Sequence, residues 1–175
     1  MNHFIIADSS QCIGCRTCEI ACAAAHSGPS GLNPQNFAPR LKVVKTERIT
    51  TPVLCRQCEN APCANACPTG AIHYLDNCVQ VRQSLCIGCK TCALACPYGM
   101  ITVGAVPVAA TATRPVARRA SALKCDLCGE RDRGPACVEA CPTGALKVVR
   151  MNQLELGQSL KQRRAANGAL PGLGG

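Results

Sequence analysis

Residues 86–97 have the sequence Cys86-Ile87-Gly88-Cys89-Lys90-Thr91-Cys92-Ala93-Leu94-Ala95-Cys96-Pro97, in which the cysteines follow the spacing C-x2-C-x2-C-x3-C. The first three thiolates are close enough in sequence to bind three irons of one cubane cluster. The fourth lies about one helical turn further on and points away from them. The proline after it ends the helix and turns the chain. This spacing is that of paired [4Fe-4S] sites, in which the fourth cysteine of a group binds the other cluster of the pair.

The same pattern occurs four times along the chain. Residues 12–18 differ from residues 86–92 at one position only, and the sequence Cys-Pro-x-Gly closes three of the four groups. One supersecondary unit has therefore been repeated. The groups are Cys12, Cys15, Cys18 and Cys22 (group one), Cys55, Cys58, Cys63 and Cys67 (group two), Cys86, Cys89, Cys92 and Cys96 (group three), and Cys125, Cys128, Cys137 and Cys141 (group four).

Two groups depart from the ideal spacing and one lacks the closing proline, in ways that leave their cysteines usable as ligands. Groups two and four have longer middle gaps, Glu59–Pro62 and Gly129–Ala136, which lengthen a surface loop. Group one has Ala23 in place of the proline, so we expect its helix to continue through Ala24 and Ala25. The final gap of three residues is kept in every group.

Zinc and disulfide bonds are the two alternatives for so many cysteines. Structural zinc sites combine two C-x2-C pairs in a tetrahedron, which gives no reason for the third cysteine of each triplet. Disulfides require an oxidising compartment. The N-terminus lacks the basic and apolar regions of a secretory signal, so the sequence predicts a cytoplasmic protein. No apolar run is long enough to span a bilayer, so we expect no direct membrane insertion.

The lengths of the connections indicate which groups share a module. Groups two and three are separated only by residues 68–85, enough for one hairpin, and the other connections are longer. We therefore expect group two to pair with three and group one with four; the alternative pairs one with two and three with four. The expected ligand sets are Cys12, Cys15, Cys18 and Cys141 (cluster A), Cys125, Cys128, Cys137 and Cys22 (cluster B), Cys55, Cys58, Cys63 and Cys96 (cluster C), and Cys86, Cys89, Cys92 and Cys67 (cluster D).

The composition is consistent with a metal-centred fold. The 175 residues include 17 cysteines but only two phenylalanines, two tyrosines and no tryptophan. Because aromatic residues normally supply much of a core's buried area, the fold needs another source of stability. Sixteen ligating thiolates in four clusters would also reduce the formal net charge of +9 to about +1. That balance removes the electrostatic reason to expect nucleic acid as a partner.

Short strands are expected after the cysteine groups, with a hairpin turn at Asp76-Asn77. Residues 104–123 have low complexity and are interpreted as a flexible connection. Residues 152–166 are predicted to form a polar, basic helix, and residues 171–175 to be disordered. The predicted strands are residues 40–45, 71–74, 79–81, 101–103 and 146–149.

We predict two modules and a tail. The outer module combines residues 1–54 with 97–150, the inner module is residues 55–96, and residues 151–175 form a basic, partly disordered tail. Outside the cysteine groups, Cys78 is interpreted as a small apolar core residue and His26 as a surface or helix-end residue. Charged residues beside cluster cysteines are interpreted as solvent-exposed or, alternatively, as tuning cluster potentials; they are Arg16, Lys90 and Lys124. Tight turns are expected at Gly70, Gly99 and Gly144.

These motifs resemble those of the four-cluster electron-transfer subunits of molybdenum oxidoreductases and hydrogenases. That family includes the iron–sulfur subunits of formate dehydrogenase, dimethyl sulfoxide reductase and formate hydrogenlyase. The resemblance covers residues 3–150 and is carried by FIIAD (4–8) before CIGC (12–15), by CRQCENAPC (55–63) and by KCDLC (124–128). It implies an α+β fold of tandem ferredoxin-like modules, with small β-hairpins and short helices packed round four [4Fe-4S] clusters.

The resemblance also implies a function. Single electrons would pass between a molybdenum-dependent formate dehydrogenase, or a related catalytic subunit, and a redox partner such as a [NiFe] hydrogenase. The sequence contains no dinucleotide fingerprint, nucleophile–base pair or phosphate loop, so we expect a non-catalytic subunit. Two alternatives stay open: an accessory factor in the maturation of those enzymes, and the iron–sulfur subunit of another molybdenum reductase.

Overall fold

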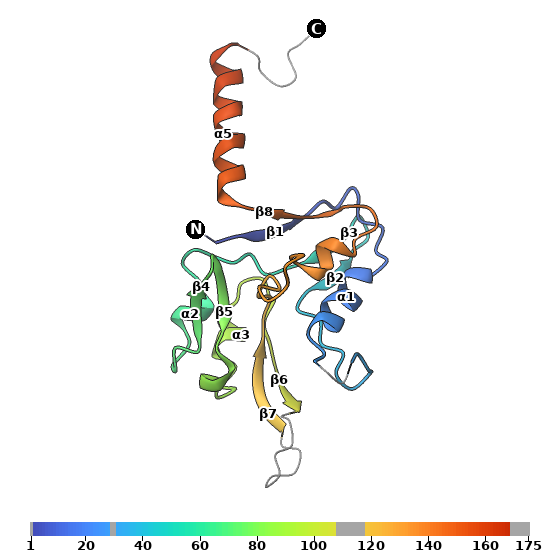
Figure 1. Cartoon of the computed structure of the whole chain (residues 1–175), viewed down its shortest axis with the longest axis vertical. Coiled ribbons are helices and arrows are strands. Elements are labelled where there is room, and N and C mark those ends of the chain that lie inside the picture. Colours follow the sequence, from blue (N-terminus) through green and yellow to red (C-terminus); the bar gives the residue numbers. More distant parts are fainter. Residues whose placement is uncertain (1, 29–30, 108–117, 169–175) are drawn as a thin grey trace.

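Four antiparallel strand pairs and five α-helices make up the described part of the chain. The computed structural model describes residues 2–28, 31–107 and 118–168. The predicted disorder of residues 171–175 lies outside these ranges. The secondary structure is a mixture of helices and small strand pairs, which confirms the α+β class (Figure 1).

The first strand pair joins the two ends of the repeated region. β1 (Phe4–Ala7) runs antiparallel to β8 (Leu146–Val149), with Ile5 opposite Val148, and the two strands lie side by side below the C-terminal helix in Figure 1. β8 has the predicted bounds. β1 was not among the predicted strands, because a run of four apolar residues is equally compatible with a helix.

The predicted hairpin at Asp76-Asn77 is confirmed. β4 (Ile72–Leu75) and β5 (Cys78–Val81) are antiparallel, and each begins within one residue of its predicted position. Asp76 and Asn77 have φ values of +50° and +57°. Two successive left-handed residues are typical of a type I′ turn, whose twist matches that of the flanking strands, and Asp and Asn tolerate this conformation. A 3₁₀ turn, η1 (Gln83–Leu85), then leads into the third cysteine group.

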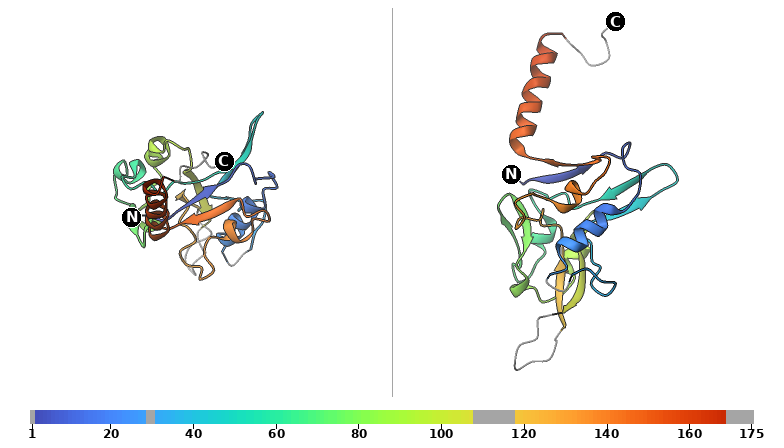
Figure 2. Two further views of the ribbon diagram at one scale, coloured as in Figure 1. Left: turned by 90° about the horizontal axis from the view of Figure 1, so that it is seen from above. Right: turned by 45° about the vertical axis from the view of Figure 1, so that its right-hand side comes forward.

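A second hairpin projects sideways from the body (Figure 2). It consists of β2 (Lys42–Lys45) and β3 (Thr50–Val53). The strand predicted for residues 40–45 is confirmed from Lys42 onward. β3 was not predicted because Pro52 lies within it, and proline normally argues against a strand. Proline is tolerated here because β3 has a free edge in a two-stranded sheet.

The prediction of a flexible connection over residues 104–123 is wrong for the residues that the structure describes. β6 (Thr102–Pro107) and β7 (Arg118–Leu123) form an antiparallel pair, and residues 108–117 lie outside the described ranges. The inner end of this pair is anchored because Ala122 packs beside Ile101 in a buried core. Hydrophobic packing at one end thus orders a segment whose composition alone indicates no structure.

Two hydrophobic cores are built around cysteines. α1 (Thr17–Ala25), which includes Ala24 and Ala25 as predicted, contacts α4 (Ala136–Glu139), and α2 (Pro62–Asn65) contacts α3 (Thr91–Ala95). The first core uses both ends of the chain: Ile5, Cys18, Cys22, Leu41, Val43, Leu54, Cys137 and Leu146. The second core uses the middle: Ala61, Cys63, Ile72, Val79, Cys92, Ile101 and Ala122. Residues 97–123 were predicted from the sequence to belong to the outer module. Two of them, Ile101 and Ala122, nevertheless pack in the second core together with residues of the inner module.

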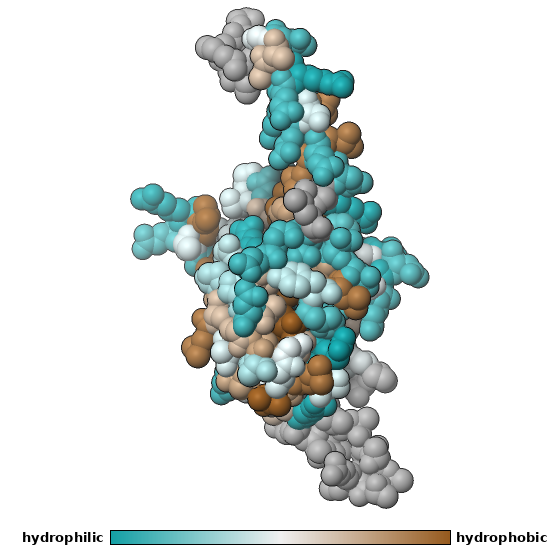
Figure 3. Space-filling model, turned by 90° about the vertical axis from the view of Figure 1, so that its left-hand side faces the viewer, coloured by the Kyte–Doolittle hydropathy of each residue, from teal (hydrophilic) through white to brown (hydrophobic). Residues whose placement is uncertain are grey.

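The C-terminal helix α5 (Met151–Ala166) projects away from the body (Figures 1 and 2). The helix predicted for residues 152–166 is thereby confirmed. Side chains of residues 152–166 are exposed or half-buried, and hydrophilic residues dominate the face of this helix seen in Figure 3. Within the described ranges, no helix combines the length and the apolar character that crossing a membrane would require.

Candidate iron–sulfur sites

Three cavities of nearly equal size are each lined by four cysteines. Their volumes, open mouths included, are about 320, 310 and 330 Å³, so the same kind of group fits each of them. In every cavity three cysteines come from one group and the fourth from another. The linings contain Cys12, Cys15, Cys18 and Cys141 in the first cavity, Cys55, Cys58, Cys63 and Cys96 in the second, and Cys86, Cys89, Cys92 and Cys67 in the third.

The cysteines of the fourth set also converge: they are Cys125, Cys128, Cys137 and Cys22. Burial raises the pKa of Cys137 to about 12, and the charges of neighbouring Cys22 and Cys128 add to this rise. Burial also raises the pKa of Cys125 well above its ordinary value, with a further contribution from Cys137. Because iron binds the thiolate, these buried thiols must lose their protons when a metal is bound.

The two C-I-G-C triplets have the same local geometry. Gly14 and Gly88 each have a φ of +72°, and the residue before each helix, Arg16 or Lys90, is also left-handed. These left-handed residues curl the chain so that three cysteines face one cavity. In both triplets a threonine hydroxyl donates to the middle sulfur at 3.3 Å: Thr17 Oγ1 to Cys15 Sγ, and Thr91 Oγ1 to Cys89 Sγ.

Gly88→Ala is expected to lower the free energy of unfolding by about 3 kcal/mol. About 1 to 2 kcal/mol comes from the positive φ, and the rest from overlap, because the new Cβ would lie 2.3 Å from the Cβ of Ala120. Gly99→Ala is the matched control, since Gly99 has a φ of +63° but an added Cβ there would meet no atom within 4 Å; it should cost about 1 kcal/mol. Denaturant unfolding of the iron-loaded proteins measures both, and equal losses would contradict the steric argument.

The expected turn glycines are confirmed. Gly70, Gly99 and Gly144 have φ values of +61°, +63° and +65°, and each amide donates to the carbonyl of the preceding group's last cysteine. None of these glycine amides contacts a sulfur among the described hydrogen bonds. Amides of other residues do so: that of Met100, next to Gly99, donates to Cys96 Sγ at 3.5 Å, and that of Gln57 donates to Cys55 Sγ at 3.5 Å.

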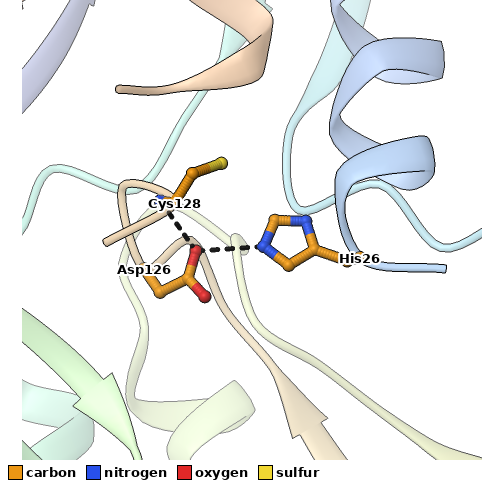
Figure 4. Close-up of side chains that lie close together, drawn as sticks. All are labelled: His26, Asp126 and Cys128. Atoms are coloured by element: carbon orange, nitrogen blue, oxygen red, sulfur yellow. Dashed lines mark hydrogen bonds and ion pairs between the residues drawn. The ribbon is translucent and has the colours of Figure 1, made fainter. Parts of the chain in front are cut away.

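His26 joins a charged network beside group four, which the sequence did not reveal (Figure 4). Its Nε2–H donates to Asp126 Oδ1 at 3.1 Å and its Nδ1–H to the carbonyl oxygen of Cys22 at 2.8 Å. The Arg40 guanidinium also contacts Asp126, and the Arg40 amide donates to Cys22 Sγ at 3.3 Å. His26 is the C-cap residue of α1, which confirms the predicted helix-end position, and its side chain is 16% exposed. One hundred residues separate His26 from Asp126, and no local signal links them.

The ionisation states of His26 and Asp126 follow from these contacts. Burial alone would lower the pKa of His26, but the hydrogen bonds to the Asp126 carboxylate and to Cys22 together outweigh it and raise the pKa to about 9. Burial likewise opposes ionisation of Asp126, yet the bond from His26 and the Arg40 charge hold its pKa well below the ordinary value. Both ring nitrogens of His26 face acceptor oxygens, which fits the protonated imidazolium.

The stability that His26 contributes is expected to depend on pH. Its folded-state pKa lies above the ordinary 6.5, so the contribution is complete below about pH 6.5 and is lost as the pH rises through about 9. The size is at most about 3 kcal/mol, since one pKa unit corresponds to about 1.4 kcal/mol. Thermal unfolding of wild type and His26→Gln between pH 6 and 10 tests this. A stability difference that stays constant across the range would contradict it.

The structure agrees with the sequence interpretation of Cys78 and corrects that of Lys124. Cys78 is 2% exposed and lies outside the four sets, in agreement with a buried apolar role. Lys124 is also buried, at 3% exposure, so its interpretation as a solvent-exposed charge is wrong, whereas Arg16 and Lys90 are exposed as expected. The position of Lys124 next to Cys125 was the only signal that the sequence offered.

Comparison with known proteins identifies the family. The 4Fe-4S dicluster domain matches residues 46–151, and a 4Fe-4S binding domain matches residues 9–25. The chain belongs to the 4Fe-4S dicluster family. Together the two matched ranges contain all sixteen grouped cysteines. The predicted [4Fe-4S] cofactor is therefore confirmed, and the four-sulfur linings described above are the donor set that such clusters use.

The chain is also similar to curated proteins over most of its length. The chain is 51% identical to the Electron transport protein HydN of Escherichia coli (strain K12), over 95% of this chain and 98% of HydN. It is 44% identical to Formate hydrogenlyase subunit 2 of the same strain, over 85% of this chain and 82% of that protein. A chain of the active site complex BamBC of benzoyl coenzyme A reductase superimposes with a TM-score of 0.43 at 21% identity, covering 93% of this chain and 90% of its own. The similarity to HydN, together with the 4Fe-4S domain matches, supports electron transfer as the general function.

Proposed function

We propose that this protein is a non-catalytic relay that carries single electrons through four [4Fe-4S] clusters. The proposed ligand sets are those given above for clusters A to D. Three of them coincide with the cysteines that line one cavity each. The fourth, for cluster B, is supported by the convergence of Cys22, Cys128 and Cys137. Bound clusters supply reversible one-electron chemistry, and the protein's part is to hold them and set their potentials.

The contacts between cysteine loops support the order A–B–C–D for the relay. Cys18 and Cys137, from the sets of A and B, pack in the first core, and Cys63 and Cys92, from the sets of C and D, pack in the second. The two cores meet where Gln57 Nε2 donates to the carbonyl of Cys125 at 2.9 Å, which joins the loops of C and B. Cys15 of set A and Cys89 of set D are the exposed cysteines. Exposure at both ends of this order, and at neither middle position, is the observation that carries the proposal.

The proposed partners follow from the relatives. HydN is named as an electron transport protein and another relative as a subunit of formate hydrogenlyase. We infer that one end of the relay exchanges electrons with a molybdenum-dependent formate dehydrogenase or related catalytic subunit. The other end would serve a second redox enzyme, for which a [NiFe] hydrogenase is the leading candidate.

Anaerobic purification followed by metal analysis and spin-resonance titration tests the relay. About sixteen irons per chain and matching inorganic sulfide are expected from four cubanes. Addition of formate with formate dehydrogenase should reduce the clusters, and addition of hydrogenase should reoxidise them with release of hydrogen. Zinc without sulfide would refute the cofactor. Full cluster content without electron exchange, together with capture only of immature enzyme, would favour a maturation factor instead.

A further inference from the structure

Lys124 is the one buried lysine or arginine within the described ranges. Its Nζ donates to Gln57 Oε1 at 3.0 Å, to the Cys125 carbonyl at 3.0 Å, and to the Val79 carbonyl. An ammonium carries three N–H groups, and three acceptor oxygens surround it, so the geometry is that of the charged form. A buried charge is strongly disfavoured unless its surroundings compensate it.

No carboxylate provides that compensation in the described part of the chain. None of the ion pairs there involves Lys124. Instead, Lys124 lines the cavity of Cys55, Cys58, Cys63 and Cys96, and it directly precedes Cys125. The anionic groups near this ammonium are therefore the cysteine sets of two different clusters, C and B.

Gln57 completes a bridge between the two sets. It lies between Cys55 and Cys58 and is 2% exposed. Its Oε1 accepts from Lys124 and from the Val79 amide, while its Nε2 donates to the Cys125 carbonyl. The amide and the ammonium thus fix the loop of set C against the loop of set B.

We propose that Lys124 is a positioning residue whose fixed positive charge is shared by clusters B and C and raises the reduction potential of both. The role rests on the proposed relay. Reduction adds one electron to a site that is already anionic, and a nearby cation in a low-dielectric interior stabilises the reduced state. The two central positions of the relay would then hold an electron more readily than the two ends, and the ends would return it quickly to a partner.

Potentiometric spin-resonance titration of the full-length, cluster-loaded protein tests this role. Lys124→Met keeps most of the side-chain volume and removes the charge. We expect the reduction equilibrium of clusters B and C to weaken about tenfold, which is about 59 mV for a one-electron couple, while A and D stay unchanged. The signals of B and C are assigned as those lost in Cys22→Ala and Cys96→Ala. Lys90→Met is the matched control, because Lys90 also adjoins a cluster cysteine but is exposed.

A second variant covers the case in which Lys124→Met does not fold. Gln57→Glu keeps acceptor oxygens for Lys124 and Val79 but places a carboxylate charge beside the ammonium. The two charges cancel, so the variant should lower the same two potentials. The proposal is overturned if the folded variants leave the reduction equilibrium constants of clusters B and C within threefold of the wild-type values. The same holds if they shift the potentials of all four clusters equally. It is also overturned if Lys90→Met shifts D as much as Lys124→Met shifts B and C. Wild-type protein without four cluster signals would refute the relay itself, whereas intact signals with unmoved potentials would refute only the role of Lys124.

Discussion

Cys141→Ala is expected to remove the cluster held by Cys12, Cys15 and Cys18 and to leave the cluster of its own group in place. Cys141 lines the cavity of the first triplet, and Cys125, Cys128 and Cys137 converge with Cys22 instead. Iron content should fall from about sixteen to about twelve per chain, because one cubane carries four irons. Iron analysis and spin resonance of anaerobic protein measure the loss.

Cys78→Ala is the control for this experiment. Cys78 is 2% exposed, more deeply buried than any of the ligand candidates, but lies outside all four sets, so its removal should leave about sixteen irons. If Cys141→Ala instead abolished the signal that Cys137→Ala abolishes, each group would bind its own cluster, and the exchanged fourth ligand would be wrong.

Removal of iron is expected to unfold the protein. Among the residues whose burial the structure describes, 22 are buried and apolar; eight of these are cysteines and six are alanines, which leaves eight larger aliphatic side chains in two separate cores. Each larger side chain contributes about 1.5 to 3 kcal/mol on burial, too little to order a chain of this length. Thiolate–iron bonds must therefore supply much of the folding free energy.

Circular dichroism and amide hydrogen exchange before and after anaerobic chelation test this dependence. We expect the cooperative thermal transition to disappear and protection in β1 and β8 to be lost. Addition of iron and sulfide under reducing conditions should restore both, which separates metal loss from irreversible damage. A colourless protein that melts as cooperatively as the loaded one would contradict the expectation.

The features that the sequence predicts well are those set by neighbours along the chain. The cysteine groups, the Asp76-Asn77 turn, the strand at 146–149 and the C-terminal helix all follow from local spacing and propensity. Contacts between distant residues were predictable only where the cysteine groups imply them, as for Cys141 and the first triplet, which line one cavity. The pairing of β1 with β8 and the packing of Ala122 beside Ile101 depend on which surfaces meet, and a single sequence does not contain that information.

The same limit applies to the site. The types of the ligand residues were evident, but their electrostatic surroundings were not. Lys124 and Arg16 both adjoin a cysteine of a cluster group, and only the fold distinguishes the buried charge from the exposed one. His26 obtains its carboxylate partner from a loop one hundred residues away.

The pairing of β1 with β8 also fixes the order in which the chain can mature on the ribosome. β4–β5 and β6–β7 join segments that are neighbours in sequence, so the second core can form while synthesis continues. The first core cannot close until residue 149 has emerged from the exit tunnel, because its last strand pairs with the first one made. Iron delivered to the nascent chain therefore finds the cysteines around the second core ready first, and those around the first core only at the end of translation.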